Sequence, residues 1–299
     1  MEGRSKKIYT FIKDVGGVLQ DGAEALMDIL VPRTCAVCGR TLNTGERYLC
    51  IYCEADMPLT YYWARKKNPM ADKVNAIIQR HLEAMFKEGE TSYGNEQIEG
   101  AHSLPRPPKY SFAAALFFYH GENRYKRIPQ RLKYLGDIAI GRFYAEMLGE
   151  FLRCSEAFKD IDLVVPVPLH WARRRKRGYN QAEIIAKSIA GVLGVPVRTD
   201  ILVRKKRTQT QTKLGVEAKS RNVSDAFDIR DRFRKHGASQ TGGFVSLRAS
   251  FSEKVRHILL VDDVFTTGST LAACINALQP YIGTSVRISC ATLGFVNSG

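Results

Sequence analysis

Hydrophobic positions recur along the chain at two spacings, which distinguish predicted helices from predicted strands. Apolar residues three or four positions apart predict helices over residues 8–30, 70–86, 123–134, 138–152, 180–193 and 269–278. Short apolar runs predict strands over residues 113–119, 162–168, 258–261 and 286–293. Polar stretches containing Gly, Pro or Ser predict a linker at 89–109 and an insertion at 230–253.

The alternation of strands and helices after residue 110 predicts an α/β domain with a mostly parallel sheet. We expect three parts. Residues 1–60 form an N-terminal helix and a cysteine module, residues 61–109 a helical linker or insertion, and residues 110–299 the α/β domain.

The composition is that of a globular protein, with 44% hydrophobic and 25% charged residues among 299. No apolar run approaches the ~18 residues that a membrane-spanning helix needs, so we expect no membrane insertion. The first 32 residues alternate apolar and charged positions and do not resemble a secretory signal. We therefore expect a cytoplasmic protein.

The formal charge of +15 is concentrated in one segment. Residues 170–222 contain 14 Lys or Arg and three acidic residues. Such a concentration favours a polyanionic partner, either nucleic acid or a phosphorylated small molecule. The alternative is a solubilising surface.

Four cysteines form two CxxC pairs separated by 11 residues: Cys35, Cys38, Cys50 and Cys53. Two such pairs suit one tetrahedral Zn²⁺ site with four thiolate ligands, which would be structural rather than catalytic. A redox pair fits this linked pattern poorly. The other cysteines, Cys154, Cys274 and Cys290, lie in apolar contexts and are predicted to be core residues.

The most informative segment runs from Ile258 to Thr270. An apolar strand ends in Asp262 and Asp263, a short loop with Gly268 follows, and a helix begins near Ser269. A loop that leads into a helix N-terminus presents N–H groups and a positive dipole end to a phosphate. The two carboxylates would repel a bare phosphate, so ribose hydroxyls or a phosphate-bound Mg²⁺ are their natural partners. The alternative is an ordinary strand–turn–helix with surface acids.

This segment resembles the signature for 5-phosphoribosyl-1-pyrophosphate (PRPP) in type I phosphoribosyltransferases. The resemblance implies that Asp262 and Asp263 contact the ribose hydroxyls, with Mg²⁺ accompanying PRPP. It implies that Thr266, Thr267, Gly268, Ser269 and Thr270 hold the 5-phosphate, and that Val264 and Phe265 belong to the same substrate-binding segment. The aromatic Phe265 departs from the general pattern.

Further stretches resemble the ComF family of competence-associated, phosphoribosyltransferase-like proteins, in which an aromatic residue at the Phe265 position is typical. They are Val165-Pro-Val-Pro-Leu-His170, Arg177-Gly-Tyr-Asn-Gln-Ala182, Arg221-Asn222 and Leu132-Lys133-Tyr134. The family also commonly opens with a short helix and a four-cysteine zinc module. The resemblance covers most of the chain, apart from about residues 77–109 and 230–253.

By analogy with type I enzymes, the loop after the strand at 162–168 would bind pyrophosphate through Arg173, Arg177 and Asn180. His170 and Glu183 are candidate acid–base residues. The basic stretch from Arg204 to Arg221 is predicted to be a mobile hood over PRPP, and a disordered loop or a nucleic-acid contact is the alternative. For Arg173 to Arg177 alone, a solvated basic edge is an equal alternative.

Three functions follow. The first is an enzyme that transfers a phosphoribosyl group to an acceptor that the sequence does not name. The second is a DNA-uptake accessory that binds single-stranded DNA or a DNA-processing protein without catalysis, with Trp171, Tyr179 or Phe227 stacking on bases. The third is a PRPP sensor without turnover. Neither Walker nor helicase motifs occur in the sequence.

Overall fold

The computed structural model describes residues 32–92, 109–119, 124–205, 226–234, 255–282 and 285–296. The chain divides into two compact units, Met1–Met57 and Pro58–Gly299. The predicted helix at 8–30 and most of the predicted hood, including Arg221, lie outside the described residues. None of the described helices is long and apolar enough to cross a bilayer.

The first unit is built around the two cysteine pairs. Thr34 and Thr41 form an antiparallel bridge that closes the first CxxC turn. In that turn the Gly39 N–H donates to the Cys35 carbonyl, and Gly39 has a φ of 79° that favours glycine. The second pair lies at helix α2, Ile51–Ala55, where Cys50 is the N-cap.

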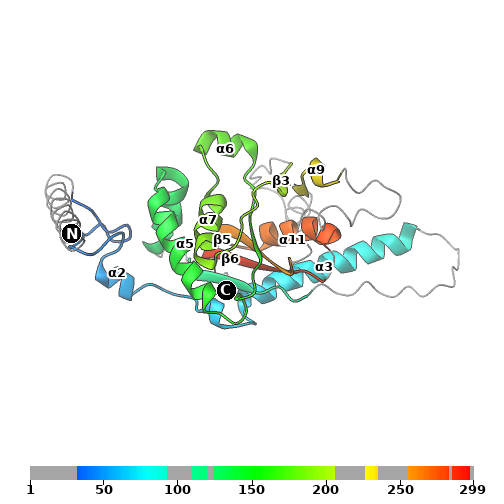
Figure 1. Cartoon of the computed structure of the whole chain (residues 1–299), viewed down its shortest axis with the longest axis horizontal. Coiled ribbons are helices and arrows are strands. Elements are labelled where there is room, and N and C mark those ends of the chain that lie inside the picture. Colours follow the sequence, from blue (N-terminus) through cyan, green and yellow to red (C-terminus); the bar gives the residue numbers. More distant parts are fainter. Residues whose placement is uncertain are drawn as a thin grey trace, which may run out of the picture. The chain divides into compact units, whose positions relative to one another are not determined.

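The second unit contains a four-stranded parallel sheet in the order β1–β6–β5–β2 (Figure 1). Its strands are β1 (Ala113–Phe118), β2 (Leu163–Pro166), β5 (His257–Phe265) and β6 (Arg287–Phe295). The prediction of an α/β domain with a mostly parallel sheet is confirmed. A separate antiparallel pair consists of β3 (Leu202–Arg204) and β4 (Phe227–Ile229), which flank the predicted hood.

Helices cover both faces of the parallel sheet. Ile258 and Leu260 of β5 belong to one core cluster with side chains of α3 (Pro69–Ser92) and α11 (Ser269–Ile282). The intervening strand residues point the other way. On that side α5 (Ile138–Arg153) and α7 (Gln181–Leu193) pack together, and Gly149 permits their close approach because a Cβ there would lie 2.9 Å from Val192.

The chain leaves β2 and β5 in opposite directions across the sheet. After β2 it passes through α7 to Val197, which forms a parallel bridge with Val164 on the free edge of β2. After β5 it passes through α11 to β6, on the other side of β5. The carboxyl ends of β2 and β5 therefore flank a topological switch point, which is where open α/β sheets bind ligands.

The region of residues 123–134 and the end of α3 differ most from the predictions. The single helix predicted at 123–134 is wrong: the chain forms a 3₁₀ turn η2 (Arg124–Lys126), a short α4 (Arg127–Gln130) and a π-helix η3 (Arg131–Leu135). Pro129 lies within α4, and its missing N–H interrupts the helical hydrogen bonds. Helix α3 continues to Ser92, past the predicted start of the linker at residue 89.

The core cysteines are predicted correctly at two of three positions. Cys274 and Cys290 are buried, whereas Cys154 is exposed. Cys154 is the C-cap of α5, where the apolar face of the helix has ended. The prediction of Cys154 as a core residue is therefore wrong.

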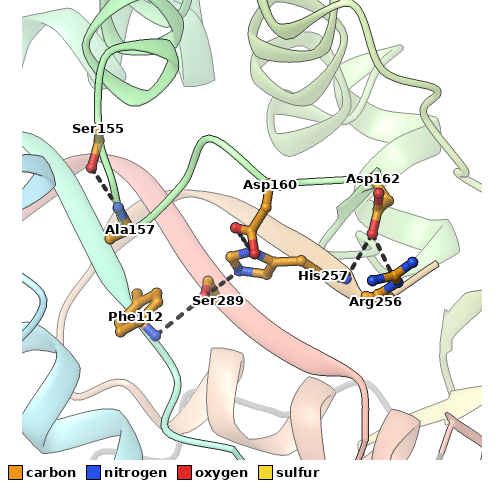
Figure 2. A network of polar contacts seen from close by, with 8 residues as sticks. All are labelled: Phe112, Ser155, Ala157, Asp160, Asp162, Arg256, His257 and Ser289. Carbon is orange, nitrogen blue, oxygen red and sulfur yellow. Dashed lines mark hydrogen bonds and ion pairs between the residues drawn. The ribbon is translucent and has the colours of Figure 1, made fainter. Parts of the chain in front are cut away.

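A hydrogen-bonded network connects the amino-terminal ends of the strands (Figure 2). The buried His257 imidazole contacts Asp160 Oδ1 through Nδ1 at 2.8 Å and Ser289 Oγ through Nε2 at 2.7 Å. Ser289 Oγ accepts from the Phe112 N–H, and Asp162 accepts from the N–H groups of Arg256 and His257. Ser289 is completely buried, so this Ser–His–Asp arrangement joins strand ends and leaves no access for a substrate.

This network predicts how the stability of the fold depends on pH. Burial lowers the pKa of His257, and the Asp160 carboxylate only partly offsets this effect. Below pH ~6.5, His257 therefore binds a proton more readily in the unfolded chain than in the folded chain. As the pH falls, this contribution lowers the free energy of unfolding by up to ~1.4 kcal/mol per pH unit. Urea unfolding between pH 5 and 8 measures this slope.

His257→Gln should remove that contribution to the slope, because glutamine does not titrate. His81→Gln, at a partly exposed histidine on α3, is the matched control and should leave the wild-type slope unchanged. Equal slopes for His257→Gln and the wild type would contradict this account.

Candidate functional site

The two loops that the sequence analysis singles out lie next to each other at the carboxyl edge of the sheet. Strands β2 and β5 pair in parallel from Leu163 with Ile258 to Pro166 with Val261. The Val167 N–H then donates to the Val261 carbonyl at 2.8 Å, just before the acid pair. The loop that follows β2 therefore begins beside Asp262.

The acid pair lies among the last residues of β5 rather than after the strand, because β5 extends to Phe265 and does not end at residue 261. Asp262 follows Ile258 and Leu260 on one face, and Asp263 faces the opposite side. Burial and the neighbouring charge of Asp263 raise the pKa of Asp262 to about 7. The Asp263 N–H donates to Asp262 Oδ1 at 2.8 Å and opposes this shift.

Arg204 supplies positive charge on the Asp262 side. It is the last residue of β3, and its guanidinium lies 5.0 Å from the centre of the Phe227 ring on β4. Burial and the charge of Arg173 lower the pKa of Arg204, whereas Asp262 raises it. Three predicted site residues, Arg173, Arg204 and Asp262, are thus close enough to interact electrostatically.

Lys133 supplies positive charge on the Asp263 side, and the sequence analysis assigns it no role. Its Nζ lies 2.8 Å from Asp263 Oδ2. Burial lowers the pKa of Lys133, but the Asp263 carboxylate more than offsets this, so the pKa is raised overall. The signal that could have identified it is its place in the Leu132-Lys133-Tyr134 stretch that carries the family resemblance.

The loop after β5 turns sharply into α11. Gly268 has a φ of 82°, and a Cβ at this position would lie 2.6 Å from Cζ of Phe265. Phe265 is buried against Phe295, so its side chain packs against the loop on the core side. Only its backbone can contact a ligand. Thr266 and Thr267 are exposed, and Val264, Ser269 and Thr270 are partly buried.

The hydroxyl groups of this loop surround the start of a 14-residue helix. Thr267 Oγ1 and Ser269 Oγ are 3.0 Å apart, and the Ser269 N–H points to Thr267 Oγ1. The Ala272 N–H donates to the Gly268 carbonyl and begins the helical hydrogen bonds of α11. The geometry matches the loop-to-helix arrangement that binds phosphate groups.

The loop after β2 contains an unpredicted short helix, α6 (Trp171–Arg177). His170 caps it, because Nδ1 accepts from the Ala172 N–H at 3.2 Å. Asn180 occupies the N-cap of α7 but makes no side-chain cap; its Nδ2 donates to the Val167 carbonyl and ties the two ends of the loop. Arg177 Nη1 donates to Gln181 Oε1. A catalytic role for His170 stays a prediction.

The four cysteines of the first unit converge on one point. Their sulfur atoms all lie within 4.8 Å of one another, and those of Cys38 and Cys50 are 3.7 Å apart. Zn–S bonds of ~2.3 Å in a tetrahedron place sulfur atoms ~3.8 Å apart. Burial raises the pKa of Cys35, but N–H groups of Cys38, Cys50 and Val37 outweigh this and lower it to about 6. The cluster could hold a metal ion such as zinc.

Comparisons with known proteins agree with this architecture. Residues 176–298 match the model of the phosphoribosyl transferase domain. Over 146 residues, 48% of this chain and 56% of the relative, the chain is 33% identical to competence protein F of Haemophilus influenzae. It is 30% identical to the DNA utilization protein YhgH of Salmonella typhi over 130 residues, 43% of this chain and 48% of that protein. No solved structure matches the chain significantly.

The matched segment spans about half the length of these curated relatives. The acid pair, the following loop and α11 lie within the residues that match the domain model. The domain match, the two relatives and the four-cysteine cluster support the resemblance to the ComF family of phosphoribosyltransferase-like proteins.

Proposed function

We propose that the α/β unit binds PRPP, or a related ribose phosphate, at the carboxyl edge of β5 and transfers its phosphoribosyl group to an acceptor. The observation that carries this proposal is the joint position of Asp262, Asp263 and the loop to α11 at the switch point of the sheet. The carboxylates accept hydrogen bonds from the ribose hydroxyls. The loop N–H groups and hydroxyls bind the 5-phosphate.

The transfer separates charge, and basic residues around the site compensate it. The bond from C1 of the ribose to the pyrophosphate oxygen breaks, and a bond from an acceptor nitrogen to C1 forms. Pyrophosphate leaves with negative charge, which Arg173, Arg177 and Arg204 counter. Asn180, which ties the loop after β2, keeps Arg173 and Arg177 in place.

Mg²⁺ fits this proposal. Asp262 offers a carboxylate whose raised pKa reflects a surplus of negative charge and burial, and carboxylate oxygens are the ligands that Mg²⁺ prefers. Asp262 and Asp263 would hold it together with the phosphate oxygens of PRPP. When bound, the ion neutralises charge on the departing pyrophosphate.

Neutralising the acid pair tests the binding proposal. Calorimetric titration of the wild type with PRPP and Mg²⁺ should give saturable binding. Asp262→Asn/Asp263→Asn should weaken it about 100-fold or more, because hydrogen bonds to charged groups contribute ~1.5–3 kcal/mol each.

The matched control is Glu150→Gln/Glu156→Gln, which removes two charges from exposed residues at and beyond the end of α5. This variant should bind PRPP as the wild type does. Absence of PRPP binding by the wild type, or wild-type affinity in the acid-pair variant, would contradict the proposal.

We also propose that the cysteine cluster holds one structural Zn²⁺. The four ligands leave no open position for a substrate, and such a site supplies the folding free energy that a segment of this size lacks.

Elemental analysis of the purified chain should give about one zinc per chain. Serine at any of the four positions should abolish the bound zinc and expose residues 32–57 to protease, whereas Cys154→Ser, at an exposed cysteine, should do neither. A fully folded, metal-free wild type would contradict the zinc proposal.

A second candidate function is binding of single-stranded DNA, as the names of the relatives, competence protein F and DNA utilization protein, suggest. The observation that favours it is α6, a helix with no buried residue that carries five cationic side chains. Trp171 at its start is 67% exposed. Cations next to an exposed aromatic ring suit a phosphate backbone and a stacked base.

This candidate predicts a salt-dependent affinity for oligothymidylate, measured by fluorescence anisotropy. Arg174→Gln/Arg175→Gln/Lys176→Gln should make the slope of log K against log salt less steep by about two, at ~0.7 per lost contact. The exposed Arg65, Lys66 and Lys67 provide a matched triple control that should keep the slope. An unchanged slope in the α6 variant would exclude this helix as the DNA contact.

A further inference from the structure

The π-helix η3 contacts both the loop after β2 and the carboxyl end of β5. Leu132 is completely buried and packs so closely on α5 that a Cβ at Gly141 would lie 2.7 Å from it. Gly136, with a φ of 70°, ends η3, and the Arg131 guanidinium contacts Asp137 at 2.9 Å. These contacts fix the backbone of Lys133. Single π-turns are frequent at functional sites.

Contacts on one side of η3 reach the loop after β2. The Tyr179 hydroxyl donates to the Leu132 carbonyl. The Arg177 guanidinium lies 5.5 Å from the centre of the Tyr134 ring. Contacts on the other side reach β5 through Lys133, so one turn of helix contacts both the loop after β2 and the acid pair at the end of β5.

The lysine of the Lys133–Asp263 ion pair is less exposed than the lysines of the other lysine–carboxylate pairs of the described chain. Its side chain is 25% exposed, whereas those of Lys205, Lys159 and Lys187 are 46%, 58% and 61% exposed, and Asp263 is 13% exposed. Exposed pairs contribute little to stability because water screens them. A shielded pair keeps its geometry, since neither charge is well solvated without the other.

The position of this pair gives it a consequence beyond stability. Asp262 and Asp263 are adjacent carboxylates at one strand end, so each disfavours the charge of the other. The ammonium group of Lys133 compensates that repulsion, and its Nζ lies 2.8 Å from one oxygen of Asp263, Oδ2. The second oxygen, Oδ1, is the one that we assign to a ribose hydroxyl.

We propose that Lys133 is a positioning residue, which holds Asp263 so that Oδ1 accepts a hydrogen bond from a ribose hydroxyl and thereby selects ribose over deoxyribose phosphates. This inference rests on the proposed ribose-phosphate site. In this inference Lys133 determines which sugar the site prefers, and the loop before α11 binds the phosphate.

The test compares the affinities of three probes: ribose 5-phosphate, 2-deoxyribose 5-phosphate and 3-deoxyribose 5-phosphate. The wild type should bind ribose 5-phosphate about tenfold more tightly than at least one deoxy sugar. Lys133→Met should reduce that preference to less than twofold, while its affinity for the same deoxy sugar stays within about threefold of the wild type. Lys133→Arg should retain most of the preference.

Two further variants separate positioning from a general effect on charge or folding. Lys187→Met removes a lysine whose carboxylate partner, Glu183, is also 2.8 Å away, and it should retain the preference. Asp263→Asn should lose the preference, and combining it with Lys133→Met should add nothing further. Thermal unfolding of each variant checks that it is folded.

The outcomes separate this inference from the proposed function. If the wild type binds none of the three probes, the ribose-phosphate site itself is wrong. If the wild type binds them without a hydroxyl preference, or if folded Lys133→Met keeps that preference, the role of Lys133 is wrong while the site stands. Equal loss of affinity for all probes in folded Lys133→Met would also overturn the positioning role.

Discussion

A strand that is buried on both faces can carry charge only where it leaves the core, and this constraint determines the arrangement around β5. Its central residues, Ile258 to Val261, are completely buried, so charged and polar groups gather at its two ends. At each end, neighbouring elements must supply their partners, because unpaired charges in such surroundings are costly. The two ends meet this requirement differently: the groups at the amino end stabilise the sheet, whereas those at the carboxyl end suit a ligand.

At the amino end, the partners come from the neighbouring strand β6 and from the turn that leads into β2. His257, Ser289 and the carboxylates of Asp160 and Asp162 form a network that joins neighbouring strands (Figure 2). At the carboxyl end, the partners come from outside the parallel sheet: Lys133 from a π-helix and Arg204 from the β3–β4 pair. The carboxyl end is partly accessible and lies at the switch point, so it is the end that suits a ligand.

Local pattern was sufficient to predict features that are continuous in sequence. The apolar run of β5, the acids that follow it and the start of α11 lie within one short segment, and the two CxxC pairs lie within 19 residues. Lys133 could not be assigned in this way, because its partner is distant in sequence and only the packing of η3 on α5 brings them together. Helix breaks at Pro129 and the exposure of Cys154 likewise depend on where an element ends, which periodicity defines poorly.

The central claim is that the acid pair and the loop before α11 form one ribose-phosphate site. The most direct measurement is a crystal structure of the chain with PRPP and Mg²⁺. The account predicts the sugar hydroxyls at Asp262 and Asp263, with the 5-phosphate at residues 266–270. A ligand-soaked crystal in which side chains fill that position, or in which PRPP binds elsewhere on the chain, would contradict it.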